Sequence, residues 1–250
     1  MRPSPPSAVL ALPQAPQVHF YNHAKLAIID EVAYVMSSNL SKSGTGDVSS
    51  WGTFQGDRDY IVVDRDPGDV QTLKALFAAD WAGNNWNAAQ QASASGQLLP
   101  TNLIVSPVNA HGVLLSLIQS ARHSLMIECE QVSESSQEAG PSDIEQALMA
   151  LAPRIGVQLI VPQETAGQLS PALKSALQVR VHDPTLYMHA KMLLIDGQTA
   201  YVGSQNLSAA ALKHNREVGV ILSARQYPDA IARLNATFAT DWAASRPPVS

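Results

Sequence analysis

The sequence has little that would support disulfide, thiol-metal or electrostatically driven chemistry. Cys129 is the only cysteine in 250 residues, so an intrachain disulfide and a cysteine-based metal cluster are both excluded. Charged residues make up 15% of the chain, and its Lys and Arg residues are scattered without a run. Proteins that grip nucleic acid usually carry a basic face, whereas the net charge here is −5. Nucleic acid is therefore possible as a partner but not favoured.

Long hydrophobic runs are also missing. No apolar stretch reaches the roughly 20 residues that span a bilayer, so we expect no transmembrane segment. The apolar residues 9–12 are too few for a signal peptide and are flanked by prolines. The sequence predicts a soluble chain, either cytoplasmic or exported after removal of a leader. Hydrophobic residues make up 46% of it, which is enough for a sizeable core.

One eight-residue segment occurs twice. The first motif, residues 23–30, reads HAKLAIID, and the second motif, residues 189–196, reads HAKMLLID. Similar segments follow each motif, YVMSSNLS at residues 34–41 and YVGSQNLS at residues 201–208. Recurrence of this length indicates an internal repeat. We therefore predict two related domains that meet across a pseudo-twofold axis.

The two predicted repeats are unequal. We assign residues 1–82 to the first, residues 83–100 to a linker rich in Asn, Ala, Gln, Ser and Gly, and residues 101–250 to the second. The first has only 22 residues before its motif, so its front is truncated. Before its own motif, the second has predicted strands at 103–105, 125–129, 157–161 and 179–182, and predicted helices at 113–121, after the capping box Ser142–Glu145 and after Ser170-Pro171.

The motif strands set the fold class. Residues 26–29 and 192–195 are continuous apolar runs, which are typical of strands buried on both faces. Asp196-Gly197 then predicts a hairpin turn. Sheets buried on both faces need covering helices, so we predict an α/β (or α+β) fold in which mixed sheets are flanked by helices.

The motifs carry the candidate chemistry. Residues two apart on a strand point the same way, so the histidine and lysine of each motif face one space. Two such pairs could surround a phosphate with two imidazoles and two ammonium groups: His23, Lys25, His189 and Lys191. Further neutral donors are available from Asn39, Asn206, Ser37 and Ser204. A neutral imidazole can attack phosphorus, and Asp59 or Glu217 can accept a hydrogen bond from its other nitrogen.

These residues resemble the phospholipase D superfamily, whose signature is His-x-Lys-x4-Asp followed by Gly-Ser-x-Asn. The second motif region matches every position, at His189, Lys191, Asp196, Gly203, Ser204 and Asn206. The first departs in having Met36 where glycine is usual, and Asp59 where the second has Glu217. The resemblance implies that one histidine becomes a phosphohistidine while the other protonates the leaving group, without a cofactor. In two-copy relatives the histidine of the first motif is commonly the nucleophile, so the resemblance favours His23 over His189 in this role.

Other motif residues have supporting roles. We expect Asp30 and Asp196 to hold the turn after each motif strand, and Gly203 to be structural. Trp51 lies in the long loop at residues 41–57 and is a candidate for the rim of a substrate site. A lysine beside each motif histidine would repel a cation, so we expect no metal.

Three functions fit this pattern. The leading hypothesis is phospholipid hydrolysis or phosphatidyl transfer, as in the bacterial phospholipase D and cardiolipin synthase proteins that the chain resembles. The second is a nuclease of the same superfamily, and the third is an inactive scaffold that binds phosphate-bearing ligands. Strands 26–29 and 33–36 lack a predicted cover, so we also expect either a homodimer or a missing N-terminal portion.

Overall fold

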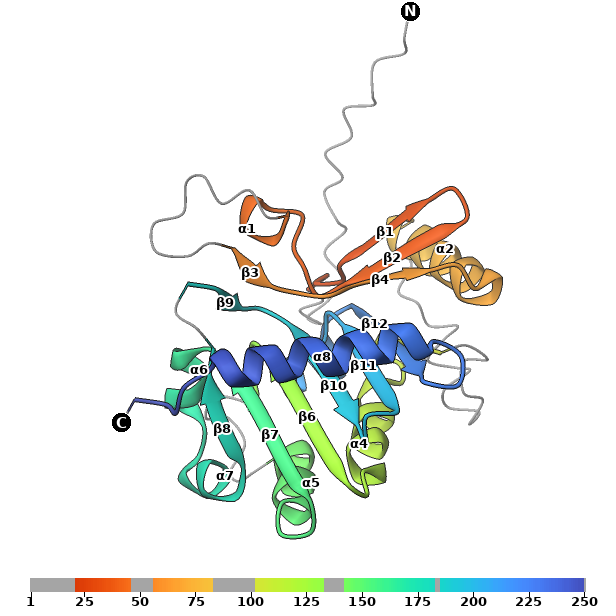
Figure 1. The fold of residues 1–250 in the computed structure, drawn as a ribbon. Helices are drawn as coiled ribbons and strands as arrows, with labels where there is room; N and C mark the ends of the chain where they lie inside the picture. Colours follow the sequence, from red (N-terminus) through yellow and green to blue (C-terminus); the bar gives the residue numbers. More distant parts are fainter. Residues whose placement is uncertain (1–20, 46–55, 83–101, 133–141, 183–184, 250) are drawn as a thin grey trace, which may run out of the picture.

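The structure, a computed structural model, describes residues 21–45, 56–82, 102–132, 142–182 and 185–249. The predicted linker and Trp51 lie outside these residues. The described residues form a large mixed sheet, a smaller antiparallel sheet and a short two-stranded ribbon, with helices packed around them (Figure 1). This is the mixed α/β architecture predicted from the sequence.

The large sheet has the strand order β5-β12-β11-β10-β6-β7-β8. Its strands are β5 (Leu103–Ser106), β6 (Ser124–Cys129), β7 (Gly156–Val161), β8 (Gln178–Val181), β10 (Lys191–Ile195), β11 (Thr199–Gly203) and β12 (Glu217–Ser223). β6, β7 and β8 are parallel, whereas the other pairings are antiparallel. The predicted mixed character of the sheet is confirmed.

Helices cover both faces of this sheet. α8 (Pro228–Ala244) crosses one face, and α4 (Ala110–Ser120) and α5 (Asp143–Leu151) lie on the other (Figure 1). The shorter helices are α6 (Gln163–Gln168), α7 (Pro171–Ala176) and the π-helical turn η1 (Ala210–His214). The predicted capping box starts α5, and Ser170 caps α7 as expected.

β10 contributes to two hydrophobic cores. Leu193 and Ile195 pack into the core beneath α4 and α5, while Met192 and Leu194 pack into the core that includes α8. All five residues of the strand are buried. The predicted burial of the second motif strand on both faces is therefore confirmed.

The smaller sheet carries the first motif. It has the order β1-β2-β4 and consists of β1 (Leu26–Ile29), β2 (Val32–Met36) and β4 (Ile61–Asp64). α1 (Lys42–Thr45) follows β2, and α2 (Pro67–Trp81) follows β4. Val35 of β2 packs with Val70 and Leu73 of α2 in the same core as Met192. The two sheets thus share one core.

The prediction that the first motif strand is buried on both faces is wrong. Ile29 is 58% exposed, and the other residues of β1 are only half-buried. In the large sheet, β6 pairs with the outer edge of β10. Among the described residues no strand pairs with the corresponding edge of β1, so its apolar side chains keep solvent contact.

Short backbone pairings join the two motif regions. β3 (Asp57–Arg58) pairs in parallel with β9 (Tyr187–Met188), and the amide of His189 donates to the carbonyl of Arg58 at 3.2 Å. In the reciprocal arrangement, the amide of His23 donates to the carbonyl of Arg216 at 2.9 Å. The main chain at each motif histidine is therefore held by the other motif region.

Two ion pairs also link the two motif regions. Arg58 contacts Asp241 of α8 at 2.7 Å, and Arg216 contacts Asp80 of α2 at 3.0 Å. Arg216 is almost fully buried and also donates to the carbonyl of Ser106 at 2.8 Å. Each arginine thus ties its own motif region to the closing helix of the other.

Candidate active site

The first histidine is oriented by a carboxylate from the other motif region. His23 Nδ1 lies 2.9 Å from both carboxylate oxygens of Glu217, the first residue of β12. Glu217 is fully buried, whereas 22% of the His23 side chain is exposed. Because Nδ1 faces the carboxylate, Nε2 is left for a ligand. This is the orienting arrangement expected of a nucleophilic imidazole.

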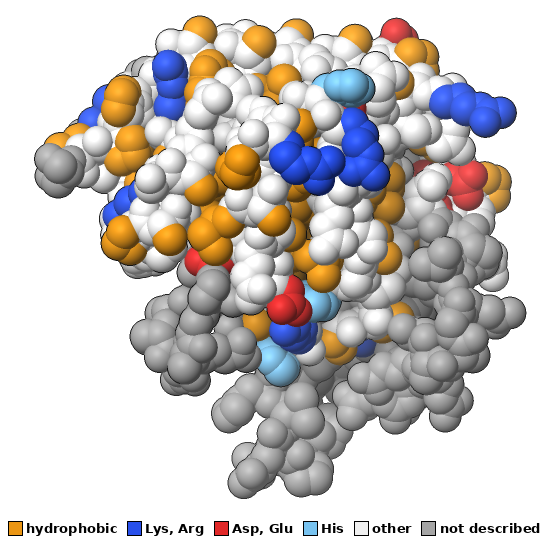
Figure 2. Space-filling view, turned by 90° about the horizontal axis from the view of Figure 1, so that it is seen from below, with side chains coloured by type: hydrophobic (Ala, Val, Ile, Leu, Met, Phe, Trp, Pro, Cys, Tyr) orange, Lys and Arg blue, Asp and Glu red, His pale blue; other side chains and the backbone are white. Residues whose placement is uncertain are grey.

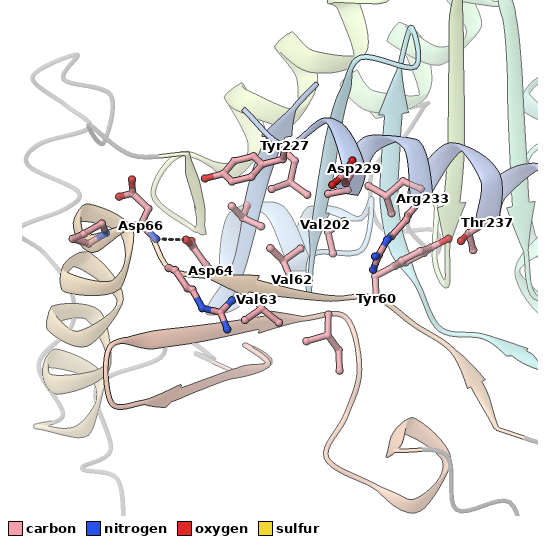
Figure 3. A pocket seen from close by; sticks show the side chains of 17 residues that line it. Tyr60, Val62, Val63, Asp64, Asp66, Val202, Tyr227, Asp229, Arg233 and Thr237 are labelled. Atoms are coloured by element: carbon pink, nitrogen blue, oxygen red, sulfur yellow. Dashed lines mark hydrogen bonds between the residues drawn. The ribbon is translucent and has the colours of Figure 1, made fainter. Parts of the chain in front are cut away.

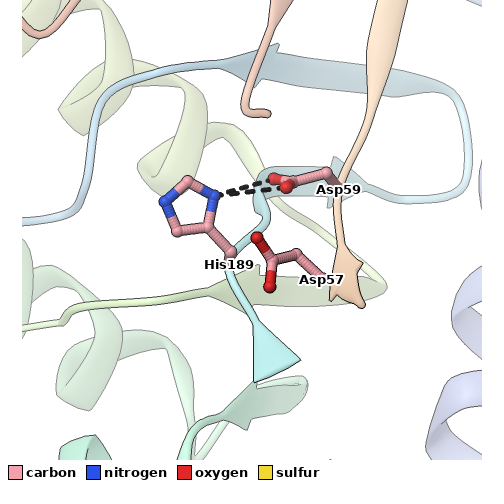
Figure 4. A group of neighbouring side chains, drawn as sticks. All are labelled: Asp57, Asp59 and His189. Carbon is pink, nitrogen blue, oxygen red and sulfur yellow. Dashed lines mark hydrogen bonds and ion pairs between the residues drawn. The ribbon is translucent and has the colours of Figure 1, made fainter. Parts of the chain in front are cut away.

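The second histidine is oriented in the equivalent way, by a carboxylate of the first motif region. His189 Nδ1 lies 3.0 and 3.2 Å from the two oxygens of Asp59, which follows β3 (Figure 4). The Ser37 hydroxyl donates to Asp59 at 2.6 Å and so fixes the carboxylate. Asn39 Nδ2 is 3.5 Å from His189 Nε2. Residues of the first motif region thus surround the histidine of the second, so the structure brings the two motifs together.

Both motif lysines are buried. Lys191 is fully buried and donates to the carbonyl of His189 at 2.5 Å, and Lys25 is 7% exposed and donates to the carbonyl of His23 at 3.1 Å. Burial, with the charge of Lys191, lowers the pKa of Lys25 to about 8. Repulsion between the two ammonium groups favours an anionic ligand that both can contact.

Glu130 is a site residue that sequence reasoning missed. Its Oε2 atom accepts from Lys191 Nζ at 2.6 Å and from Asn206 Nδ2 at 3.3 Å, and it lies 3.6 Å from His189 Nε2. Burial acts to raise the pKa of Glu130, but the charges of Lys191 and His189 outweigh it, so the pKa is lowered. Glu130 directly follows the predicted strand at 125–129 and belongs to no motif that could have revealed it.

The two motif serines are engaged within the protein. Ser37 Oγ accepts from the Tyr60 amide at 2.9 Å in addition to its bond to Asp59. Ser204 is fully buried, and its Oγ accepts from the amide of Val218 at 3.0 Å. Ser37 also donates to Asp59, and Ser204 Oγ donates to the carbonyl of Val218 at 3.3 Å. Both hydroxyls are thus engaged within the protein, and their contact with substrate stays a prediction.

Close packing around Gly203 leaves no room for a side chain. A Cβ atom at Gly203 would lie 2.5 Å from Gly219 Cα and 2.6 Å from the Tyr201 hydroxyl. The corresponding Met36 is buried, with 4% of it exposed. The first motif region thus has room for a side chain where the second has none.

The two motif aspartates differ in their contacts. Asp196 has a positive φ of 53° at the β10–β11 hairpin, and its carboxylate accepts from the backbone amides of residues 122–124 at 2.7 to 3.1 Å. Burial acts to raise the pKa of Asp196, but these donors outweigh it and the pKa is lowered. Asp30 has a similar φ of 55° but is exposed. Asp196 thus anchors the segment that leads into β6, whereas Asp30 is exposed at its turn.

One group of side chains could hold a cation. Ligand atoms of Asp57, Asp59 and His189 all lie within 4.8 Å of one another (Figure 4). Asp59 is already bonded to His189 and Ser37, so a cation there would replace those contacts. Binding of a cation by this group would therefore disturb the orientation of His189.

A cavity of about 790 Å³ lies between β4 and α8 (Figure 3). Its walls come from β4 and α8, and its floor includes Val202, Val220 and Leu222 of the large sheet. Neither motif histidine lines it. Tyr60, the neighbour of Asp59, forms one end, and Asp64, Asp66 and Tyr227 lie at the other.

The surface shows no extended basic region on the face in view. Figure 2 shows Lys and Arg side chains singly or in small groups among side chains of the other types. Among the described residues, no helix has the length and hydropathy needed to cross a membrane. The electrostatic footprint of a nucleic-acid protein is not seen on this face.

The structure thus brings two carboxylate-oriented histidines and two buried lysines together in one candidate site. The family model described as "Cardiolipin synthase, PLD-like domain" matches residues 114–242, just over half of the chain. The chain belongs to this family, and the resemblance to phospholipase D proteins is confirmed. The matched region contains the second motif.

Curated relatives agree. The chain is 26% identical over 232 residues to cardiolipin synthase A of Pseudomonas aeruginosa, covering 82% of this chain and 44% of that protein. It is 23% identical over 249 residues to cardiolipin synthase of Geobacillus kaustophilus, covering 90% of this chain and 47% of the relative. The chain therefore spans just under half the length of the curated relatives it matches.

A solved structure shares the fold. The phosphatidylserine synthase of Haemophilus influenzae superposes with a TM-score of 0.61 at 13% identity, covering 90% of this chain and 63% of that one. The similarity supports the mixed α/β architecture of the chain.

Proposed function

We propose that this chain is a metal-independent phosphodiesterase that acts through a phosphohistidine. The observation that carries the proposal is the reciprocal pairing of the two histidines, His23 with Glu217 and His189 with Asp59. Each carboxylate holds Nδ1, so each ring presents Nε2 as either a nucleophile or a proton donor. The lysines and asparagines supply positive charge and donors for the phosphoryl oxygens.

The proposed reaction has two balanced steps. Nε2 of one neutral imidazole forms a bond to phosphorus as the bond to the leaving oxygen breaks, and the partner imidazolium gives that oxygen its proton. Water or an alcohol then attacks phosphorus and breaks the P–N bond, while the now neutral partner takes the proton of the nucleophile. An alcohol acceptor gives transfer, and water gives hydrolysis.

We assign His23 as the nucleophile and His189 as the acid. Nε2 of His189 lies 3.6 Å from the Glu130 carboxylate, in addition to the Asp59 contact at Nδ1. Both ring nitrogens of His189 thus face an oxygen acceptor, an arrangement that suits a proton donor. His23 is paired with Glu217 alone among these carboxylates and is more exposed, which suits attack on a substrate.

A phospholipid is the substrate class that we propose. Family membership supports a phosphodiester of this kind, and the neighbouring cavity offers apolar walls at Val62, Val202 and Leu234. An acyl chain in this cavity would start near Tyr60, one residue from Asp59. The net charge of −5 does not favour a polyanionic nucleic acid.

A turnover screen in EDTA tests the proposal. We expect hydrolysis of a phospholipid and of bis-(p-nitrophenyl) phosphate to persist in the chelator, and single-stranded DNA to be a poor substrate. Loss of activity that a divalent ion restores would contradict metal independence. Preferred cleavage of DNA would make the chain a nuclease, and absence of all turnover would favour the binding scaffold.

The two histidines can be separated by leaving group. His23→Ala should abolish turnover of every diester, because the nucleophile is lost. His189→Ala should abolish turnover of a phospholipid but retain part of it with p-nitrophenolate, which leaves without a proton. The opposite pattern would exchange the two roles. Adding a short alcohol and measuring the transferred product distinguishes transfer from hydrolysis.

A further inference from the structure

The phosphate-binding half of the second motif region already holds an anion from the chain itself. Oε2 of Glu130 is bonded to Lys191 Nζ and Asn206 Nδ2 and lies beside His189 Nε2. These three groups are the ones that would receive a phosphoryl oxygen. The carboxylate of Glu130 therefore stands where a ligand oxygen is expected.

The main chain keeps Glu130 at this place. Its amide donates to the carbonyl of Ala190 at 2.9 Å, and its carbonyl accepts from Thr165 Oγ1 at 2.6 Å. Only the side chain is free to rotate, and 24% of it is exposed. When a ligand displaces the carboxylate from Lys191, the negative charge stays at the edge of the site.

The two halves of the site differ in this respect. Lys191 has a carboxylate partner at 2.6 Å, whereas Lys25 has no ion pair within 4 Å in the described part of the chain. A bound phosphate would thus meet an uncompensated ammonium group on one side and a competing carboxylate on the other. Repulsion from that carboxylate grows with the charge of the ligand.

We propose that Glu130 is a specificity-determining residue that makes the site select singly charged phosphodiesters over doubly charged phosphomonoesters. A diester carries one negative charge, whereas a monoester carries between 1.5 and 2 at neutral pH, as a rough guide. The displacement of Glu130 from Lys191 opposes both ligands equally, so the extra charge alone discriminates. The same repulsion would speed release of a phosphomonoester product. This inference rests on the proposed phosphodiesterase function.

Methyl phosphate and dimethyl phosphate are matched probes, because they differ by one methyl group and one titratable charge. Their dissociation constants can be measured by ³¹P NMR titration, without turnover. The Glu130→Gln variant can keep neutral contacts to Lys191 and Asn206. In this variant we expect the preference for dimethyl phosphate over methyl phosphate to fall about tenfold. Glu31→Gln removes an exposed carboxylate on the β1–β2 turn and should leave the ratio unchanged.

The wild-type protein offers a test without substitution. Near pH 5 methyl phosphate carries about one charge, so the preference for the diester should fall by about the same factor as in the Glu130→Gln variant. A ratio that is unchanged both in folded Glu130→Gln protein and between about pH 5 and pH 7.5 would overturn the proposal. If the wild-type protein binds neither probe, the proposed function falls as well. If it cleaves diesters but shows no charge preference, only the role of Glu130 is refuted.

Discussion

Lys25 makes the alkaline limit of the activity predictable. Burial and, to a smaller extent, the charge of Lys191 lower its pKa from 10.5 to about 8, against the opposing charges of Glu217, Glu130 and Asp59. Its ammonium group is the one that we expect to contact the phosphoryl oxygens without a carboxylate partner. Raising the pH above 8 should therefore remove the charge on which substrate capture depends.

The magnitude follows from the pKa of about 8. Lys25 would be about 90% charged at pH 7 and about 10% charged at pH 9, a roughly ninefold fall. With an ordinary lysine pKa it would still be about 95% charged at pH 9. We therefore expect kcat/KM, which reports the free enzyme, to fall about ninefold across this range. The fall in kcat should be smaller, because bound phosphate stabilises the charged lysine.

The assay is a pH profile of kcat/KM on bis-(p-nitrophenyl) phosphate, compared with Lys25→Arg. Arginine stays charged throughout, so the variant should be slower at neutral pH but flat to pH 9. A wild-type profile that is flat to pH 9 would refute the assignment of Lys25. So would a Lys25→Arg profile that falls in parallel with the wild type.

The depressed pKa also fixes the sign of a stability effect. The pKa of Lys25 is lower in the folded protein than in the unfolded chain. Burying the charged lysine therefore destabilises the folded state at pH values at which lysine is protonated. This destabilisation is greatest below pH 8 and disappears as the pH rises towards 10.5. Lys25→Met should therefore raise the free energy of unfolding at pH 7 by about 1–3 kcal/mol and abolish turnover. Urea unfolding of the two proteins measures the first effect, and a destabilised variant would contradict it.

Three further predictions follow from the joined motif regions. Arg216→Ala should lower the free energy of unfolding by about 3–5 kcal/mol, because it removes a buried arginine and leaves the half-buried carboxylate of Asp80 unpaired. Chemical denaturation measures this, and a loss under ~1 kcal/mol would contradict it. Glu217→Gln and Asp59→Asn should each reduce kcat by about 10²- to 10⁴-fold with little change in unfolding, and near wild-type turnover would remove their orienting role. The exposed Ile29 and Ile61 should promote self-association, detectable by light scattering and a hydrophobic dye, whereas a monomer that binds no dye would show that their exposure has been misjudged.

Much of the architecture followed from local sequence patterns. The apolar run at 192–195 predicted a strand buried on both faces, because covering layers on both sides require uninterrupted hydrophobic residues. The Ser142–Glu145 capping box and Ser170-Pro171 located helix starts, since their hydrogen bonds are made within a few residues. The double motif also predicted which histidines and lysines would face one space.

The pairing of those residues depended on contacts between distant segments. Sequence offered Asp59 and Glu217 as partners for the histidines but did not say which would hold which; the structure pairs each with the histidine of the other motif region. Glu130 belongs to no repeated pattern, and only the packing of β6 beside β10 brings it to Lys191. The exposure of β1 likewise depends on which strand lies next to it. Periodicity and motifs report a residue's own strand or helix, whereas orientation and electrostatic partners are decided by the elements that fold against it.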